Sequence, residues 1–142
     1  MPVADLDGWW LVTHSVEATA HAAWTGQRLV YRLQLRQDGD QITGKGSTWA
    51  KNGVALTPAQ KTPVSVTGTR RAEGIRLLIE EHGRGAVREV SLEWPSSPAA
   101  DRFAGRFASA ATKTFGISEA TREPGGVTTR APRRAGARAR SG

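Results

Sequence analysis

Residues 28–49 read RLVYRLQLRQDGDQITGKGSTW and decide the fold. Apolar side chains alternate with polar ones over the first half of this stretch, at Leu29, Tyr31, Leu33 and Leu35. A period of two places the apolar set on one face of a β-strand. The turn Asp38-Gly39-Asp40 follows, where glycine readily takes the positive φ of a tight hairpin. Residues 41–49 then return, so the stretch predicts an antiparallel β-hairpin.

The same alternation recurs in short segments up to about Arg122, and turn-forming residues separate them. It predicts six further strands: Trp9 to about Ala18, Pro63 to Thr69, Gly74 to Glu81, Val87 to Trp94, Arg102 to Ser109, and about Gly116 to Arg122. Short links favour sequential antiparallel pairing, and pairing of the last strand with the first would remove both exposed edges. We therefore expect an all-β fold, a single up-and-down antiparallel β-barrel of about eight strands. A two-sheet sandwich is the rival fold.

Two connections are longer than a tight turn requires, at residues 19–27 and 51–62. Long loops on a regular scaffold often carry binding residues. They equally form short helices or flaps that plug one end of a barrel. The sequence leaves both alternatives open.

The composition changes after Arg122. Residues 122–142 carry six arginines and one glutamate, so +5 of the chain's net charge of +7 lies there. Val127 is the single sizeable apolar side chain beyond Arg122, too little to offset the entropy of ordering the segment. We predict a barrel domain over residues 1–122 and a disordered tail, rich in Arg, Gly and Pro, over residues 123–142.

The arginines of the tail favour weak, nonspecific contact with polyanions through counterion release. They are Arg130, Arg133, Arg134, Arg138 and Arg140. A solvated extension without a partner explains the same composition. Both interpretations place the basic character of the chain outside the barrel.

Several classes of protein are excluded by what the chain lacks. It contains no cysteine, which excludes disulfides, thiolate metal sites and a thiol nucleophile. Its first seven residues have neither the basic nor the apolar region of a signal peptide, and no stretch approaches the roughly 18 apolar residues of a membrane-spanning helix. We expect a soluble chain that is cytoplasmic by default. Its oligomeric state does not follow from the sequence.

Gly8-Trp9-Trp10 opens the first strand as a Gly-x-Trp motif, and about eight antiparallel strands follow. In this the chain resembles the lipocalin and avidin-like (calycin) barrels. The resemblance implies that Trp10 plugs the base of the barrel and that Arg122, near the end of the last strand, covers it. Residues 24–29 and 42–46 are similar to uncharacterised bacterial lipocalin-like domains. The chain departs from secreted lipocalins in lacking cysteines, a long helix after the strands and a large first loop.

The chain has five tryptophans but one tyrosine and three phenylalanines. If Trp10 faces inward, alternation carries Val12 and His14 inward with it. We expect the open end of the barrel to hold a small hydrophobic ligand between a set of rings and polar groups: His14, Trp24, Tyr31, Trp49 and Trp94. The alternatives are that the tryptophans only pack the core and rim, and that His14 and Tyr31 form a hydrogen-bonded structural pair.

No catalytic or metal-binding pattern stands out. The three histidines have no ligand spacing, and no cysteine supports them. Neighbouring residues of a strand point to opposite faces, so Ser15 cannot pair with His14, and Glu80 and Glu81 cannot act together. We therefore predict no catalytic residue, no metal and no cofactor.

Three functions are compatible with these observations. The favoured one is a non-enzymatic binding module that holds a small apolar ligand in the open end of the barrel. The alternative is an interaction or scaffold barrel with a filled core and a basic tail that contacts polyanions. An enzyme is the third, and a cluster of His14, Tyr31 and a carboxylate inside the cavity would promote it.

Overall fold

A computed structural model of the chain describes residues 5–19, 25–83, 86–97, 101–110 and 113–123. Trp24 and the five arginines of the predicted tail lie outside the described residues. The division into a barrel over residues 1–122 and a tail over residues 123–142 stays a prediction.

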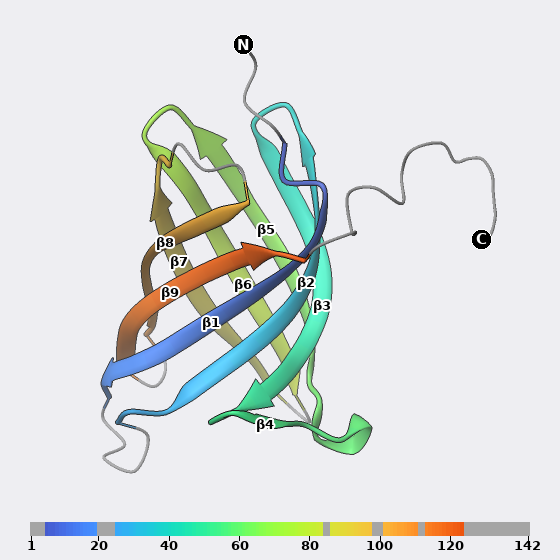
Figure 1. The fold of residues 1–142 in the computed structure, drawn as a ribbon, viewed down its shortest axis with the longest axis vertical. Coiled ribbons are helices and arrows are strands. Elements are labelled where there is room, and N and C mark those ends of the chain that lie inside the picture. Colours follow the sequence, from blue (N-terminus) through green and yellow to red (C-terminus); the bar gives the residue numbers. More distant parts are fainter. Residues whose placement is uncertain (1–4, 20–24, 84–85, 98–100, 111–112, 124–142) are drawn as a thin grey trace, which may run out of the picture.

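Eight long strands make up the described part of the chain (Figure 1). They are β1 (Gly8–Ala18), β2 (Arg28–Asp38), β3 (Gln41–Lys51), β5 (Pro63–Arg71), β6 (Gly74–Gly83), β7 (Ala86–Pro95), β8 (Arg102–Ser109) and β9 (Thr114–Arg122). The connection between β3 and β5 contains the two-residue strand β4 (Val54–Ala55) and the 3-10 turn η2 (Pro58–Gln60). Each predicted strand is present, and most extend one or two residues beyond the predicted limits.

The strands close into a barrel. Each long strand pairs antiparallel with the next long strand along the chain. β3 therefore pairs directly with β5, and the short β4 separates them only in the sequence. The last strand pairs with the first, from Arg122 opposite Trp10 to Phe115 opposite Ala18. The predicted all-β, up-and-down, eight-stranded barrel is therefore confirmed, and the sandwich is excluded.

The hairpin that decides the fold forms as predicted. Asp38 pairs with Gln41, and Gly39 has a φ of 60°, which glycine adopts without steric cost. Gly46 in β3 permits a close approach of the neighbouring strand, because a Cβ atom built there would lie 1.9 Å from the carbonyl oxygen of Arg32. Glycine inside this strand thus allows the tight coiling of a narrow barrel.

The interior is lined by the alternating apolar set. Trp10 and Val12 on β1 are fully buried, as are Leu33 and Leu35 on β2. His14 also faces inward and is 2% exposed. The predicted inward faces of the first two strands are confirmed.

The barrel has two unlike ends, which we call the base and the mouth. The base lies where β1 begins and where the β2–β3 and β5–β6 hairpins turn, at the top of Figure 1. The mouth lies where β1 ends and β2 begins, and β4 and η2 flank it at the bottom of Figure 1. Up-and-down topology carries alternate strand ends to the same end of the barrel, so widely separated residues meet at each.

Among the described residues, no helix has the length and apolar character needed to cross a membrane.

Candidate functional site

Aromatic side chains fill the base. The ring of Phe103 lies 5.7 Å from that of Trp10 and 5.7 Å from that of Trp94, centroid to centroid. Both tryptophans are fully buried, and both indole N–H groups are satisfied: Trp10 Nε1 donates to the carbonyl oxygen of Leu6, and Trp94 Nε1 donates to Ser118 Oγ, each at 2.8 Å. The base is therefore a packed core.

Arg122 covers this core from β9. Its guanidinium carbon lies 4.6 Å from the ring centroid of Trp10, within the range of a cation–π contact. The same guanidinium donates hydrogen bonds to the backbone oxygens of Asp5 and Asp7. Burial lowers the pKa of Arg122, while the carboxylate of Asp5 opposes that change. Arg122 thus ties the N-terminal segment across the base.

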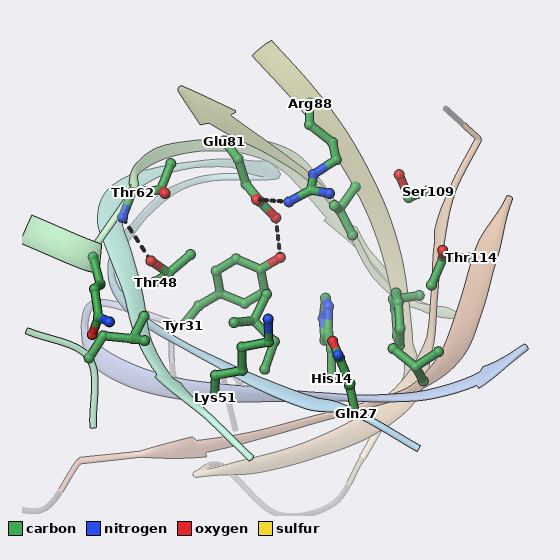
Figure 2. Close-up of a pocket in the computed structure, with 16 residues that line it drawn as sticks. His14, Gln27, Tyr31, Thr48, Lys51, Thr62, Glu81, Arg88, Ser109 and Thr114 are labelled. Carbon is green, nitrogen blue, oxygen red and sulfur yellow. Dashed lines mark hydrogen bonds and ion pairs between the residues drawn. The ribbon is translucent and has the colours of Figure 1, made fainter. Parts of the chain in front are cut away.

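The mouth, by contrast, holds a cavity of about 420 Å³ (Figure 2). Its described lining combines apolar with polar side chains from seven of the long strands and from two connections. The residues are His14, Val16, Gln27, Leu29, Tyr31, Thr48, Lys51, Leu56, Gln60, Thr62, Glu81, Arg88, Val90, Phe107, Ser109 and Thr114. Leu56 and Gln60 belong to the connection with β4 and η2, which therefore forms part of the cavity lining.

A polar group with a buried Tyr31 and Glu81 and a partly exposed Arg88 spans one wall of the cavity. Tyr31 Oη donates to Glu81 Oε2 at 2.5 Å, and Arg88 Nη2 donates to Glu81 Oε1 at 2.9 Å, as the dashed lines in Figure 2 show. Tyr31 is 1% exposed and Glu81 5% exposed. Burial, and next the negative charge of Glu81, raise the pKa of Tyr31 well above its ordinary value. The phenol is therefore protonated at neutral pH and is a hydrogen-bond donor.

His14 stands beside this group. Its ring stacks on Phe107, with 4.2 Å between centroids and an angle of 6° between planes, and it meets the ring of Tyr31 edge-on at 5.1 Å. Its Nε2 is buried and has no hydrogen-bond partner. Burial lowers the pKa of His14 from 6.5 to about 3, so the imidazole is neutral at physiological pH.

Several other polar groups of the lining hydrogen-bond to the barrel itself. Thr48 Oγ1 accepts from the backbone N–H of Thr62 at 2.7 Å. Ser109 Oγ donates to the backbone oxygen of Glu89 at 3.2 Å. Across the part of the chain that the structure describes, His14 Nε2 is the buried side-chain nitrogen or oxygen that lacks a partner.

The residues predicted to bind a ligand are spread over three places. His14 and Tyr31 line the mouth cavity. Trp94 is packed in the base. Trp49 does not line the cavity, since its ring makes cation–π contacts with Lys61 at 3.7 Å and Arg32 at 5.1 Å. Trp24 lies outside the described residues, so its role stays a prediction.

His14 and Tyr31 approach one another without hydrogen bonding. The partner of the Tyr31 hydroxyl is Glu81, 50 positions away in the sequence. The predicted structural pair of His14 and Tyr31 is therefore a ring contact only. Tyr31 instead belongs to the polar group with Glu81 and Arg88.

Glu81, Arg88 and Phe107 are site residues that sequence reasoning missed. A signal for Glu81 was present, because Ile75, Leu77 and Ile79 alternate inward and the same period carries Glu81 inward. Glu80, its neighbour, lies on the opposite face, as predicted. Among the residues that the structure describes, no group of three or more His, Asp or Glu side chains could hold a metal ion.

Comparisons with known proteins bear on the fold alone. No protein-family model and no curated protein matches the sequence. Among solved structures, the chain is similar to a redesigned β-barrel, with 12% sequence identity, a TM-score of 0.62, and coverage of 83% of this chain and 91% of that chain. At this identity the likeness extends to the barrel architecture. The lipocalin resemblance stays a prediction.

Proposed function

We propose that the barrel is a non-enzymatic binding module that holds one small, mainly apolar molecule in the mouth cavity. The observation that carries the proposal is the cavity of about 420 Å³ inside the mouth, which is lined from seven strands. This volume falls in the usual range of small-molecule sites, roughly 300–1,000 Å³. The hollow of about 490 Å³ beside the β5–β6 hairpin at the base is lined largely by exposed side chains such as Arg76 and Glu93. A barrel that served only as a scaffold would be expected to fill both ends with its own side chains.

The walls favour an apolar ligand body. Val16, Leu29, Val90 and Phe107 present hydrocarbon to the cavity. Burial of apolar ligand surface against them stabilises the complex by about 25 cal/mol for each Å² removed from water. The eight closed strands hold these walls in place before the ligand arrives, which lowers the entropic cost of binding.

Native mass spectrometry against hydrophobic metabolites, lipids and tetrapyrroles tests the proposal. We expect complexes of one ligand per chain. Val90→Trp should abolish them, because Val90 lines the cavity and an indole would occupy it. Val87→Trp is the matched control on the same strand, since Val87 is 55% exposed, and it should leave binding unchanged. If no compound binds, or if Val90→Trp binds as well as the wild type, the cavity is not a ligand site.

The cluster of His14, Tyr31 and Glu81 supports a second candidate, an enzyme that acts on the bound molecule. The Glu81 carboxylate, which accepts a hydrogen bond from Tyr31 Oη at 2.5 Å, can take a proton from a bound molecule and return it to the product. Glu81→Gln would then keep ligand binding and stop any conversion of the ligand during incubation. If wild-type protein returns every bound compound unchanged, this candidate is wrong.

Contact with polyanions through the arginine tail stays a proposal of its own. Removal of residues 124–142 keeps Glu123, which forms an ion pair with Arg32 at 2.6 Å on the barrel. We expect the shortened chain to lose affinity for heparin at low salt while its melting temperature is unchanged. Equal heparin binding by both chains would overturn the proposal.

A further inference from the structure

The exposed large apolar side chains among the described residues gather at the mouth. Val54 is 68% exposed, Val87 55% and Phe115 47%. They come from β4 and from the first residues of β7 and β9, which the up-and-down topology brings to the same end of the barrel. Each lies within two positions of a residue that lines the mouth cavity, namely Leu56, Arg88 or Thr114. Single apolar side chains are common on protein surfaces, but a set confined to the rim of an opening marks an interaction surface.

Acidic residues are divided unequally between the two ends. Each link between long strands at the base contains one carboxylate: Asp40 between β2 and β3, Glu73 between β5 and β6, and Asp101 between β7 and β8. The N-terminal segment, which crosses the base, adds Asp5 and Asp7. The links at the mouth contain no Asp or Glu in the sequence; they are residues 19–27, 52–62, 84–85 and 110–113. An anionic partner would therefore meet less repulsion at the mouth than at the base.

Cations supply attraction at the mouth. Lys51 ends β3, Lys113 precedes β9 and Arg28 begins β2, and all three are exposed. Along the strands, the carboxylates nearest the mouth are Glu17 and Glu81. Each is neutralised by an arginine through an ion pair of 2.9 Å, with Arg106 and Arg88 respectively. The rim thus combines a net positive charge with apolar side chains.

An anionic membrane surface matches both properties of the rim. Apolar side chains stabilise a docked protein by entering the boundary between headgroups and acyl chains, and Lys and Arg are attracted to anionic headgroups. The rim also surrounds the opening of the mouth cavity, so a barrel docked there faces a phase that concentrates apolar molecules. This favours a bilayer over a folded protein as the partner.

We propose that the barrel docks mouth first on membranes that contain anionic lipids, with Val54, Val87 and Phe115 at the boundary between headgroups and acyl chains. The inference goes beyond the proposed function, because docking requires the rim and not an occupied cavity. For a barrel that binds a ligand, the membrane is then the phase from which the ligand enters.

Co-sedimentation of the full chain with vesicles tests the electrostatic part, with phosphatidylcholine alone and with about one third phosphatidylglycerol. We expect stronger binding to the anionic vesicles, and high salt should weaken it. The double variant Lys51→Gln/Lys113→Gln should lower the partition coefficient for anionic vesicles by about fivefold for each cation removed. Lys45→Gln/Arg71→Gln is the matched control, because it has the same net charge and the same arginine tail but is altered away from the mouth. It should keep most of the binding.

A fluorescent label tests the orientation. The chain has no cysteine, so an environment-sensitive dye on Val87→Cys reports on the rim alone. The same dye on Thr67→Cys reports on the exposed outer face of β5. On anionic vesicles the emission of the dye at position 87 should shift to shorter wavelength, and that of the dye at position 67 should not change.

Equal binding by the two double variants, or bound chains whose dye at position 87 does not shift, would show that overall charge or the arginine tail makes the contact. A shift that grows with protein concentration in the absence of vesicles would identify a second copy of the chain as the partner of the rim. Each of these results, or a failure to bind anionic vesicles, overturns the inference. Ligand binding is decided separately, by the mass-spectrometry screen.

Discussion

The base and the mouth of this barrel are built by the same strands and differ in what those strands carry inward. From base to mouth, the inward positions of β7 run Trp94, Leu92, Val90 and Arg88. The side chains thus become smaller along the strand and then polar. The closed sheet provides space at both ends, and the size of the inward side chains decides which end is left hollow. On β7, the hollow end thus coincides with the smaller and polar inward side chains.

Removal of a large side chain from the base should produce the largest loss of stability. We expect Trp94→Ala to lower the free energy of unfolding by about 3–5 kcal/mol, because a fully buried indole leaves a cavity in a packed core. Val90→Ala on the same strand should cost about 1 kcal/mol, because Val90 already borders open space. Urea denaturation measures both. Equal losses at the two positions would break the distinction between the ends.

The mouth should be sensitive to acid through His14. Its pKa is lowered from 6.5 to about 3 by burial, so between these values the unfolded chain binds a proton that the folded barrel does not. The contribution of neutral His14 to the free energy of unfolding is complete above pH 6.5. It decreases as the pH falls, by about 2 kcal/mol at pH 5. The loss of unfolding free energy between pH 7 and pH 5 should be smaller by that amount in His14→Phe. Identical losses in the two proteins would contradict the burial of a neutral imidazole.

One hydroxyl at each end allows a direct comparison. Ser118→Ala removes the partner of the Trp94 indole N–H in the packed base, and we expect a cost of about 1–3 kcal/mol. Tyr31→Phe leaves Glu81 paired with Arg88 at the mouth, so about 1 kcal/mol should be lost. Thermal unfolding monitored by circular dichroism measures both. A larger cost at Tyr31 would mean that the polar group of the mouth is as tightly packed as the base.

The smallest effect is expected on the outer surface, which belongs to neither end. Lys61→Met removes the ammonium group that lies 3.7 Å from the ring centroid of Trp49. Both residues are partly exposed, and such a contact contributes about 0.5–1 kcal/mol. Chemical denaturation should show a loss of that size, with ligand binding in the mouth cavity unchanged. Weaker ligand binding in Lys61→Met would link the outer surface to the cavity.

Strand positions and inward faces could be predicted from the sequence because they depend on local alternation. The placement of Trp49 could have been predicted too, since Ile42 and Thr48 share the buried phase of β3 and Trp49 falls on the other face. Gly44 and Gly46 occupy the inward positions between Ile42 and Thr48. Because they carry no side chain, the alternation of apolar and polar residues is difficult to recognise in this part of the sequence. The size of the Trp49 side chain alone therefore favours the ligand site, whereas the alternation favours the outer face.

The polar group of the mouth could not be predicted in the same way. Tyr31 and Glu81 lie on β2 and β6, which are not neighbours in the sheet, and their contact crosses the interior of the barrel. Which inward residues meet across a barrel depends on the tilt and stagger of all the strands together. Alternation gives the face of each residue and leaves its height in the barrel undetermined. Trp94 illustrates the same point, since it faces inward as expected but at the base.

Pairing of β9 with β1 places Arg122 opposite Trp10, so the first and last strands of the barrel close it together. On the ribosome, β1 is synthesised before the other strands of the barrel. Its partner β9 is synthesised only after nearly all of the described chain. During that interval the edge of β1 that β9 covers is open to other strands, including those of neighbouring nascent chains. Closure also joins residues that are far apart along the chain, which slows folding. The seam that completes the barrel is thus the place where newly made chains are most exposed to mispairing.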